Sequence, residues 1–307
     1  MIEVRELTKR YGEHVAVNNL AFKVEAGRIW GLLGPNGAGK TTTMRILTGY
    51  LPATSGRAAV AGFDVFDKPD DVKRSIGYLP EIVPLYLDMT VRGYLAFVAE
   101  IKQVPKARRK AAVARALEAS GLKDHAGRLI KNISRGYKQR VGIAQAMIHD
   151  PKVLVLDEPT IGLDPAQIRE IRELIRGLRG GHTILLSTHI LPEVTQVCDG
   201  VVIIDHGRLM ASGSLEELAA SFEKSDGVLV RLRRGGAEEA ALFRGLPGVD
   251  RVAIEGDEIR IEWGRGRDLR DDVARLALDK GLGIKEMRSV AGIEDLYMKI
   301  VAGGLEQ

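Results

Sequence analysis

The chain has 307 residues, of which 45% are hydrophobic and 28% are charged, and this composition is typical of soluble globular proteins. The length favours two domains over one small core. No run of about 18 apolar residues occurs and no signal-peptide pattern begins the chain, so we expect a cytosolic protein that is free to dock on a membrane component. The single cysteine, Cys198, excludes an internal disulfide and a cysteine-based metal site.

The charge pattern gives only a weak indication of partners. The net charge is +4, and lysines and arginines are scattered apart from a basic run at 108–110. This run lies inside a helical pattern, so we interpret it as a solvated helix face. Anionic lipid or nucleic acid is the less favoured ligand for it.

The first segment, residues 2–33, has the patterns of short strands. Apolar and polar residues alternate at 2–7 and again at 21–25. Tyr11 lies between these two stretches, and its spacing leaves two roles open. Its ring either covers a sheet edge at a turn or stacks on an adenine base.

A phosphate-binding motif follows the third strand-like run, at 29–33. Residues 34–42 read GPNGAGKTT and fit G-x-x-x-x-G-K-[ST] between a strand pattern and a helix pattern at 42–48. Glycines let the backbone wrap around phosphate oxygens, and N–H groups at a helix N-terminus attract anions. We expect Lys40 to contact the β- and γ-phosphates and the Thr41 hydroxyl to bind Mg²⁺. The predicted nucleotide-binding residues here are Gly34, Pro35, Asn36, Gly37, Ala38, Gly39, Lys40, Thr41 and Thr42.

The middle of the chain changes from strands to helices. Strands are predicted at 58–63 and 75–80, and Glu81 directly follows the second of them. Apolar residues at helical spacing then predict a helical insert at about 86–150. Ser134 suits the N-cap of a helix in this insert, and a capped helix is the structural interpretation. The functional interpretation places that helix N-terminus against an anion.

Two acidic residues follow the apolar run VLVL, which has the composition of a buried parallel strand. Ligands bind at the carboxyl ends of strands in open α/β sheets, so a site is expected at this point. We expect Asp157 to support Mg²⁺ on the phosphates and Glu158 to polarise an attacking water molecule. Of the six histidines, His189 alone follows a buried strand pattern of this kind, at 183–188.

The last part of the chain completes the first predicted domain and begins a second one. A hairpin at 201–211 and a helix at 215–222 close the first domain, which we predict as residues 1–222. Residues 225–307 show the order β-α-β-β-α-β, typical of a ferredoxin-like unit, with a last helix at 293–301. No catalytic constellation occurs there, so an accessory role is expected.

The motifs of residues 1 to about 220 together resemble those of the nucleotide-binding subunits of ABC transporters, in that family's order. GPNGAGKTT resembles the Walker A loop, VLVLDE the Walker B strand, ISRGYKQR the signature motif, GLD the D-loop, and STH the switch that ends in His189. The resemblance implies an α/β fold with a P-loop NTPase core and a mostly parallel sheet. An N-terminal antiparallel β part, the helical insert and the small α+β domain complete the expected fold. The resemblance also favours adenine stacking for Tyr11.

Two positions depart from the family pattern. The signature is usually LSGGQ, whereas Arg135 and Tyr137 stand here in place of the first glycine and the glutamine. Ser134 and Gly136 remain, and the resemblance implies that they contact the γ-phosphate. Glu81 stands where most members have a glutamine; it can still ligate Mg²⁺ but adds negative charge. Some drug- and polysaccharide-type exporters share this glutamate and a C-terminal extension, which favours an exporter or a gliding-type permease complex.

The resemblance implies a subunit that binds ATP and Mg²⁺ and powers an integral membrane permease from the cytoplasmic face of the cell membrane. Two such subunits, identical or different, would pack head to tail, with each ATP between one P-loop and the partner's signature helix. Glu158 would deprotonate water, His189 would contact the γ-phosphate, and Asp164 would couple the two sites.

Two other functions compete with this one. A soluble ABC ATPase acting on ribosomes or nucleic acid usually has two nucleotide-binding domains or a long coiled-coil insert, and the sequence predicts neither, so no nucleic acid partner is expected. A nucleotide-gated regulator with weak turnover is supported only by Glu81 and the altered signature. A GTPase is disfavoured because no N-K-x-D motif occurs.

Overall fold

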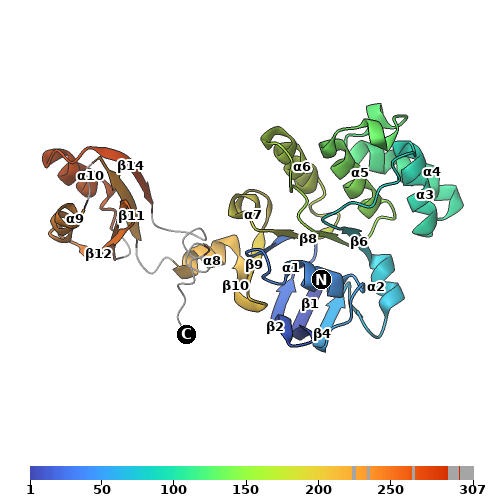
Figure 1. Cartoon of the computed structure of the whole chain (residues 1–307), viewed down its shortest axis with the longest axis horizontal. Coiled ribbons are helices and arrows are strands. Elements are labelled where there is room, and N and C mark those ends of the chain that lie inside the picture. The colour runs from blue at the N-terminus through green and yellow to red at the C-terminus, as the bar shows by residue number, and fades with distance from the viewer. Residues whose placement is uncertain (223–225, 234–235, 265–266, 290–296, 298–307) are drawn as a thin grey trace. The chain divides into compact units, whose positions relative to one another are not determined.

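The computed structural model describes residues 1–222, 226–233, 236–264, 267–289 and 297, which form two compact units, Met1–Ser212 and Gly213–Gln307 (Figure 1). The division falls inside a strand that ends at Ser214, so it lies ahead of the boundary predicted at 222–225. The assignment of independent domains 1–222 and 225–307 stays a prediction. In the described part of the chain, no helix combines the length and the apolar character that crossing a membrane requires.

The first unit contains an antiparallel sheet of order β2-β1-β4-β5. β1 (Ile2–Tyr11) pairs with β2 (His14–Val24), from Ile2 opposite Val24 to Tyr11 opposite His14. Tyr11 therefore lies at the end of a strand longer than the sequence predicted. The strand predicted at 58–63 is divided into β4 (Ser55–Val60) and β5 (Phe63–Asp64), because Ala61 and Gly62 adopt positive φ and turn the chain.

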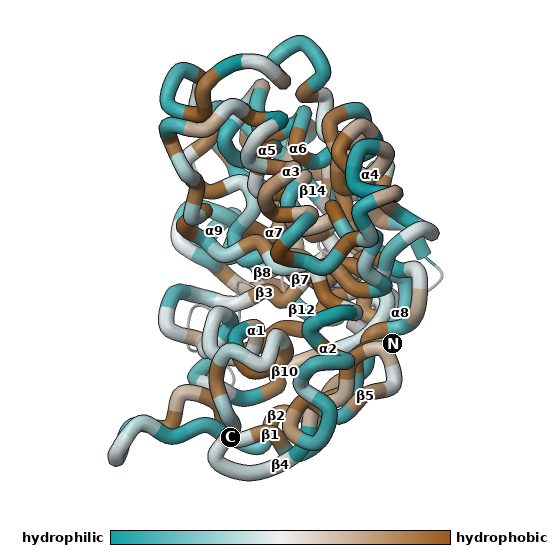
Figure 2. The backbone as a smooth tube through the Cα atoms, turned by 90° about the vertical axis from the view of Figure 1, so that its right-hand side faces the viewer, coloured by the Kyte–Doolittle hydropathy of each residue, from teal (hydrophilic) through white to brown (hydrophobic). Residues whose placement is uncertain are grey.

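The second sheet of this unit has the order β10-β9-β3-β8-β7-β6. β3 (Ile29–Leu33), β6 (Ile76–Leu79), β7 (Val153–Leu156), β8 (Thr183–Thr188) and β9 (Gly200–Asp205) run parallel. The hairpin partner of β9 is β10 (Arg208–Ser214). Every residue of β3, β7 and β8 is buried, and Figure 2 shows the hydrophobic segments of these strands side by side. The carboxyl ends of parallel strands share one edge, so the segments that follow β3, β6, β7 and β8 are brought together.

Helices surround this sheet and form the predicted insert. α1 (Lys40–Leu47) follows β3, and α6 (Pro165–Gly177) and α7 (Leu191–Val197) follow β7 and β8. The insert consists of α3 (Val91–Ile101), α4 (Lys106–Ala119) and α5 (Arg135–Met147), which share an apolar core of their own. The sequence did not predict α7 or α2 (Pro69–Ser75); each is a seven-residue helix, too short for a clear periodic pattern.

The second unit has the expected ferredoxin-like topology. After α8 (Leu215–Phe222), the elements are β11 (Asp226–Leu232), α9 (Ala237–Arg244), β12 (Val249–Glu255), β13 (Glu258–Trp263), α10 (Arg270–Asp279) and β14 (Ile284–Ser289). The sheet order is β12-β13-β11-β14, and each pair of neighbouring strands is antiparallel. The helix predicted at 293–301 lies outside the described residues, apart from Tyr297. The two units confirm the predicted fold class.

Substitutions at two adjacent residues of α9 test how the core of the second unit is packed. Phe243 is fully buried in it, whereas Leu242 is 38% exposed. Phe243→Ala should lower the free energy of unfolding of this unit by about 3–5 kcal/mol, because a cavity replaces a buried ring. Leu242→Ala should cost less than half as much. Urea unfolding, followed by Trp263 fluorescence in a Trp30→Phe background, measures both losses; equal losses would contradict the packing described here.

Candidate functional site

The loop between β3 and α1 is shaped by glycines that no other residue can replace without strain. Gly37 and Gly39 have φ angles of 83° and 98°, in the left-handed region. A Cβ atom at Gly39 would lie 2.4 Å from the Ala16 carbonyl oxygen, and one at Gly34 would lie 2.3 Å from that of Ile204. The backbone therefore closes tightly around the start of α1, as the phosphate-binding motif requires.

Lys40 occupies the first turn of α1, and its side chain is only 7% exposed. Its Nζ donates hydrogen bonds to the carbonyl oxygens of Gly34 at 2.8 Å and Pro35 at 3.1 Å. The same Nζ lies 3.6 Å from Glu158 Oε1. The loop thus holds an ammonium group beside the carboxylate that follows β7.

Asp157 lies at the end of β7, is 1% exposed and connects three segments. Its Oδ1 accepts hydrogen bonds from Ser187 Oγ at 2.6 Å and from Thr41 Oγ1 at 3.3 Å. Its Oδ2 is buried and has no hydrogen-bond partner among the residues that the structure describes. An unpaired buried carboxylate oxygen costs free energy unless a ligand satisfies it.

These oxygens fit a Mg²⁺ ion. Mg²⁺ prefers hard oxygen ligands and is commonly held by one or two carboxylates together with substrate phosphates. The Thr41 hydroxyl and the unpaired Asp157 Oδ2 provide such ligands. Within the described ranges, no group of three or more His, Cys, Asp or Glu side chains is placed to hold a metal, so phosphate and water oxygens would have to complete the coordination.

Glu158 is fixed by its backbone and by its neighbours. Its φ of 47° is left-handed, which for a residue with a side chain costs on the order of 1–3 kcal/mol and occurs preferentially at functional sites. Its N–H donates to Ser187 Oγ at 2.9 Å, and both carboxylate oxygens lie 3.1 Å from His189 Nδ1. Because an ionised carboxylate only accepts hydrogen bonds, Nδ1 carries the hydrogen in this pair.

A cavity of about 500 Å³ collects most of the predicted residues. It is lined by Tyr11, His14, Ala16, Asn36, Gly37, Gly39, Lys40, Thr41, Thr42, Glu81, Glu158, Ile161 and His189. The sequence did not predict His14, Ala16 or Ile161 as lining residues. Gly34, Pro35, Ala38 and Asp157 do not line the cavity. The carbonyl oxygens of Gly34 and Pro35 accept hydrogen bonds from Lys40, and Asp157 accepts one from Thr41. The chemical roles of these residues stay predictions.

Ser134, Gly136 and Asp164 do not line this cavity. Ser134 Oγ caps α5 by accepting from the Tyr137 N–H, which confirms the capped helix, and Asp164 Oδ1 caps α6 by accepting from Gln167 N–H at 2.9 Å. A Cβ atom at Gly136 would lie 2.8 Å from the Gln167 side chain, so the two helix starts pack closely.

Arg135, which departs from the family pattern, connects the start of α5 to the loop that precedes α6. Its Nη2 donates to the Ile161 carbonyl oxygen at 3.1 Å, and a Cβ atom at Gly162 would lie 2.4 Å from its guanidinium. The arginine therefore covers the loop that leads from Glu158 to α6.

Two further residues support the site and were not predicted. Ser187, fully buried at the end of β8, contacts both acidic residues of the site. Glu193 on α7 is 3% exposed and accepts hydrogen bonds from Thr160 and from Thr188 at 2.7 Å. The polar end of β8 was a signal for Ser187. Glu193 had none, because α7 itself was not predicted.

Known proteins are similar to this chain in sequence and in fold. The pattern of the family described as ABC transporter matches residues 17–161. The chain is 34% identical to the bacitracin transport ATP-binding protein BcrA of Bacillus licheniformis, with 99% of this chain and 98% of BcrA covered. It is 32% identical to the Nod factor export ATP-binding protein I of Cupriavidus metallidurans, with 98% and 97% covered.

A solved structure of the ATP-binding subunit of an ABC transporter has a similar fold over most of this chain. It is 30% identical, matches 73% of this chain and 93% of its own, and has a TM-score of 0.65. The sequence likeness extends over both units, and the phosphate-binding loop, Glu158 and His189 meet at one cavity of about 500 Å³. The chain therefore belongs to the ABC transporter family, as an ATP-binding subunit that hydrolyses ATP.

Proposed function

We propose that this chain hydrolyses ATP in the cavity lined by Lys40 and Glu158 and drives export through an integral membrane permease. It does so as half of a head-to-tail dimer at the cytoplasmic face of the membrane. The observation that carries the proposal is the position of the Glu158 carboxylate. It lies 3.1 Å from His189 Nδ1 and 3.6 Å from Lys40 Nζ, at the wall of a cavity framed by a phosphate-binding loop.

The loop and α1 bind the phosphates. Backbone N–H groups at the start of α1 present partial positive charge, and the Lys40 ammonium adds a full charge in a nearly buried position. Thr41, Asp157 and Glu81 hold Mg²⁺, which neutralises charge on the phosphate oxygens when it is bound. Tyr11, 47% exposed at the same cavity, stacks on the adenine ring.

Glu158 activates the attacking water. As an ionised carboxylate it accepts the proton of the water as the water attacks the γ-phosphorus, and the His189 N–H fixes the direction of its oxygens. The hydrogen bond from the Glu158 N–H to Ser187 keeps the backbone in its left-handed conformation. Lys40 and His189 stabilise the charge that develops on the transferred phosphoryl group.

A second subunit supplies the rest of the γ-phosphate contacts. Ser134 is exposed at the N-terminus of a 13-residue helix and lies outside the cavity of its own chain. A helix N-terminus of this kind attracts an anion, so the γ-phosphate bound to a partner's loop fits against Ser134 and Gly136. Asp164 caps the adjoining helix and links this surface to the loop that follows Glu158.

An exposed apolar surface supports docking of the permease. The segment after Glu81 and the outer face of α3 carry large hydrophobic side chains, and the rings of Tyr86 and Phe97 meet edge to face with centroids 5.4 Å apart. Clustered apolar side chains on a soluble surface mark contact sites for other proteins. The residues of this surface are Ile82, Tyr86, Leu87, Phe97 and Ile101, which are 36–84% exposed.

Export is the direction that the comparisons favour. The relatives named for bacitracin transport and Nod factor export align with this chain over almost its whole length, the C-terminal unit included. Glu81 and the C-terminal extension are the features that the sequence shares with exporters of drugs and polysaccharides.

Glu158→Gln should abolish most turnover while ATP binding persists. The amide has nearly the same size but is a poor proton acceptor, so the rate should fall by about 10²- to 10⁴-fold. The variant should accumulate as a closed dimer in ATP, visible by size-exclusion chromatography. Glu173→Gln, an exposed glutamate on α6, is the matched control and should hydrolyse ATP normally. Wild-type turnover by Glu158→Gln would show that another group is the base.

Thr41→Val should remove the Mg²⁺-dependent part of nucleotide binding. The valine keeps the shape of the threonine but loses the hydroxyl next to Asp157, so Mg²⁺ affinity should fall by about tenfold or more. Calorimetric titration of ATP with Mg²⁺ and with EDTA measures this difference. Thr48→Val, the same change at the far end of α1, should leave it intact. An unchanged Mg²⁺ effect in Thr41→Val would exclude Thr41 as a ligand.

Mixing two inactive variants tests the head-to-tail dimer. Lys40→Ala disables the loop of its own chain, and Ser134→Ala weakens the contact that its chain offers to the partner. A mixed head-to-tail dimer contains one site in which both parts are intact, so ATPase activity should partly return. Each variant alone should stay inactive. If the mixture is also inactive while heterodimers are present, Ser134 acts within its own chain.

A further inference from the structure

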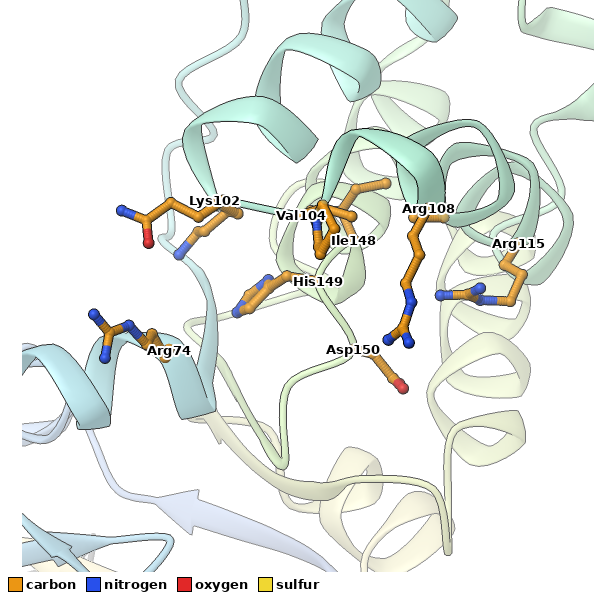
Figure 3. Close-up of a pocket in the computed structure, with 11 residues that line it drawn as sticks. Arg74, Lys102, Val104, Arg108, Arg115, Ile148, His149 and Asp150 are labelled. Atoms are coloured by element: carbon orange, nitrogen blue, oxygen red, sulfur yellow. The ribbon is translucent and has the colours of Figure 1, made fainter.

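A second cavity, of about 460 Å³, lies in the first unit and shares no lining residue with the nucleotide cavity. Its walls come from the last turn of α2, the turn between α3 and α4, the face of α4 and the segment after α5 (Figure 3). The charged and titratable residues that line it are Arg74, Lys102, Arg108, Arg115, His149 and Asp150. The cavity therefore presents four basic side chains and one carboxylate.

The α4 helix places two of these arginines on one face. Arg108 and Arg115 are seven residues apart, and the buried Ala112 lies between them on the same face. Figure 3 shows both guanidinium groups projecting from α4 into the space above Asp150. The basic run at 108–110, interpreted from the sequence as a solvated face, thus contributes one arginine to a cavity.

These cations lack carboxylate partners, in contrast to their neighbour on the same helix. Arg109 forms an ion pair with Glu100 at 2.8 Å. Across the ranges that the structure describes, Lys102, Arg108 and Arg115 form no ion pair, and Arg74 pairs only with Asp71 of its own helix, at 3.5 Å. Four like charges gathered around the single carboxylate of Asp150 repel one another, and a bound anion reduces that cost.

His149 lines this cavity as a neutral, largely buried ring. Its Nε2 lies 3.1 Å from the Ile76 carbonyl oxygen, which can only accept, so Nε2 carries the hydrogen. Burial and the neighbouring Lys102 lower the pKa of His149 to about 4, so the ring is neutral at pH 7 and Nδ1 has a free lone pair. This Nδ1 is buried and has no partner in the described part of the chain. Burial also lowers the pKa of Lys102.

We propose that this second cavity binds a phosphate-bearing anion. Arg guanidinium groups match the oxygens of phosphate in a two-pronged geometry, and Arg108 and Arg115 offer that contact side by side from α4 (Figure 3). A phosphate group carries negative charge at neutral pH and so supplies the charge that complements these cations. The volume of this cavity, about 460 Å³, falls in the range of about 300–1,000 Å³ found for small-ligand sites. The one carboxylate that lines it, Asp150, does not fill this space.

The same chemistry is offered by a soluble polyphosphate and by the headgroup of an anionic phospholipid. Ile101, in the exposed apolar surface of α3, immediately precedes Lys102, so a lipid is a reasonable source if that surface meets the permease. Binding of the phosphate group itself does not depend on that docking, nor on ATP hydrolysis. The test therefore uses both sources.

The first arm titrates inorganic pyrophosphate into the full chain with excess ADP present, so that the phosphate loop of the nucleotide site is occupied. Arg108→Gln/Arg115→Gln should weaken binding by about tenfold or more for each guanidinium lost. Lys106→Gln/Lys110→Gln removes the same charge from exposed positions of the same helix that do not line the cavity, and it should bind normally. Unchanged ADP affinity shows that both variants fold.

The second arm follows His149 by NMR, with its signal assigned from a His149→Asn variant. A bound anion favours the imidazolium form, so pyrophosphate should raise the pKa of His149 from about 4. Nonspecific attraction of pyrophosphate to the basic surface would leave the pKa of this ring unchanged.

The third arm sediments the protein with phosphatidylglycerol vesicles and with phosphatidylcholine vesicles. Retention on anionic vesicles that is lost in Arg108→Gln/Arg115→Gln, but kept in the control variant, identifies a lipid headgroup. Binding of pyrophosphate alone identifies a soluble ligand. The proposal is overturned if neither probe binds, or if both double variants lose binding equally.

Discussion

The hydrogen bonds of Asp157 Oδ1 hold the nucleotide site together. Thr41 donates to it from α1 and Ser187 donates to it from the end of β8, so a single oxygen connects α1, β8 and the segment that follows β7. Ser187 Oγ in turn accepts from the Glu158 N–H. The positions of the phosphate loop, the acidic pair and the switch histidine therefore depend on one another. The parallel register of β3, β8 and β7 makes this connection possible, because it brings their carboxyl ends to one edge.

Much of this site could be predicted because its parts are local in the sequence. The phosphate loop is recognised from spacing alone, since glycines with positive φ, a lysine and a threonine must occur in a fixed order around one helix start. Asp157 and Glu158 follow from a buried strand that ends in two acids. The β-α-β-β-α-β order of the second unit was also readable, since each element carries a clear period.

The rest could not be predicted because it depends on contacts between distant segments. Glu193 accepts hydrogen bonds from Thr160 and Thr188, yet α7 is too short for a periodic pattern to reveal it. The hydrogen bond from Arg135 to Ile161 joins residues 26 positions apart. The basic cavity is formed by residues that lie between positions 74 and 150, and only the structure shows that Arg108 faces it while Arg109 turns to Glu100.

The helix α5 connects the proposed dimer contact to the basic cavity. Ser134 caps its N-terminus at the proposed dimer contact, and His149 and Asp150 follow its C-terminus at the basic cavity. The helix also packs without a gap on β6, because a Cβ atom at Gly77 would lie 2.0 Å from the Ala146 carbonyl oxygen, and one at Gly142 would lie 2.6 Å from Leu79 Cδ1. β6 itself runs between the two cavities, with Arg74 shortly before it and Glu81 after it. A displacement of α5 relative to the sheet would have to break this packing, so α5 and β6 move as one body. An anion bound between α4 and the end of α5 would hold α4 against that body, which carries the proposed dimer contact at Ser134.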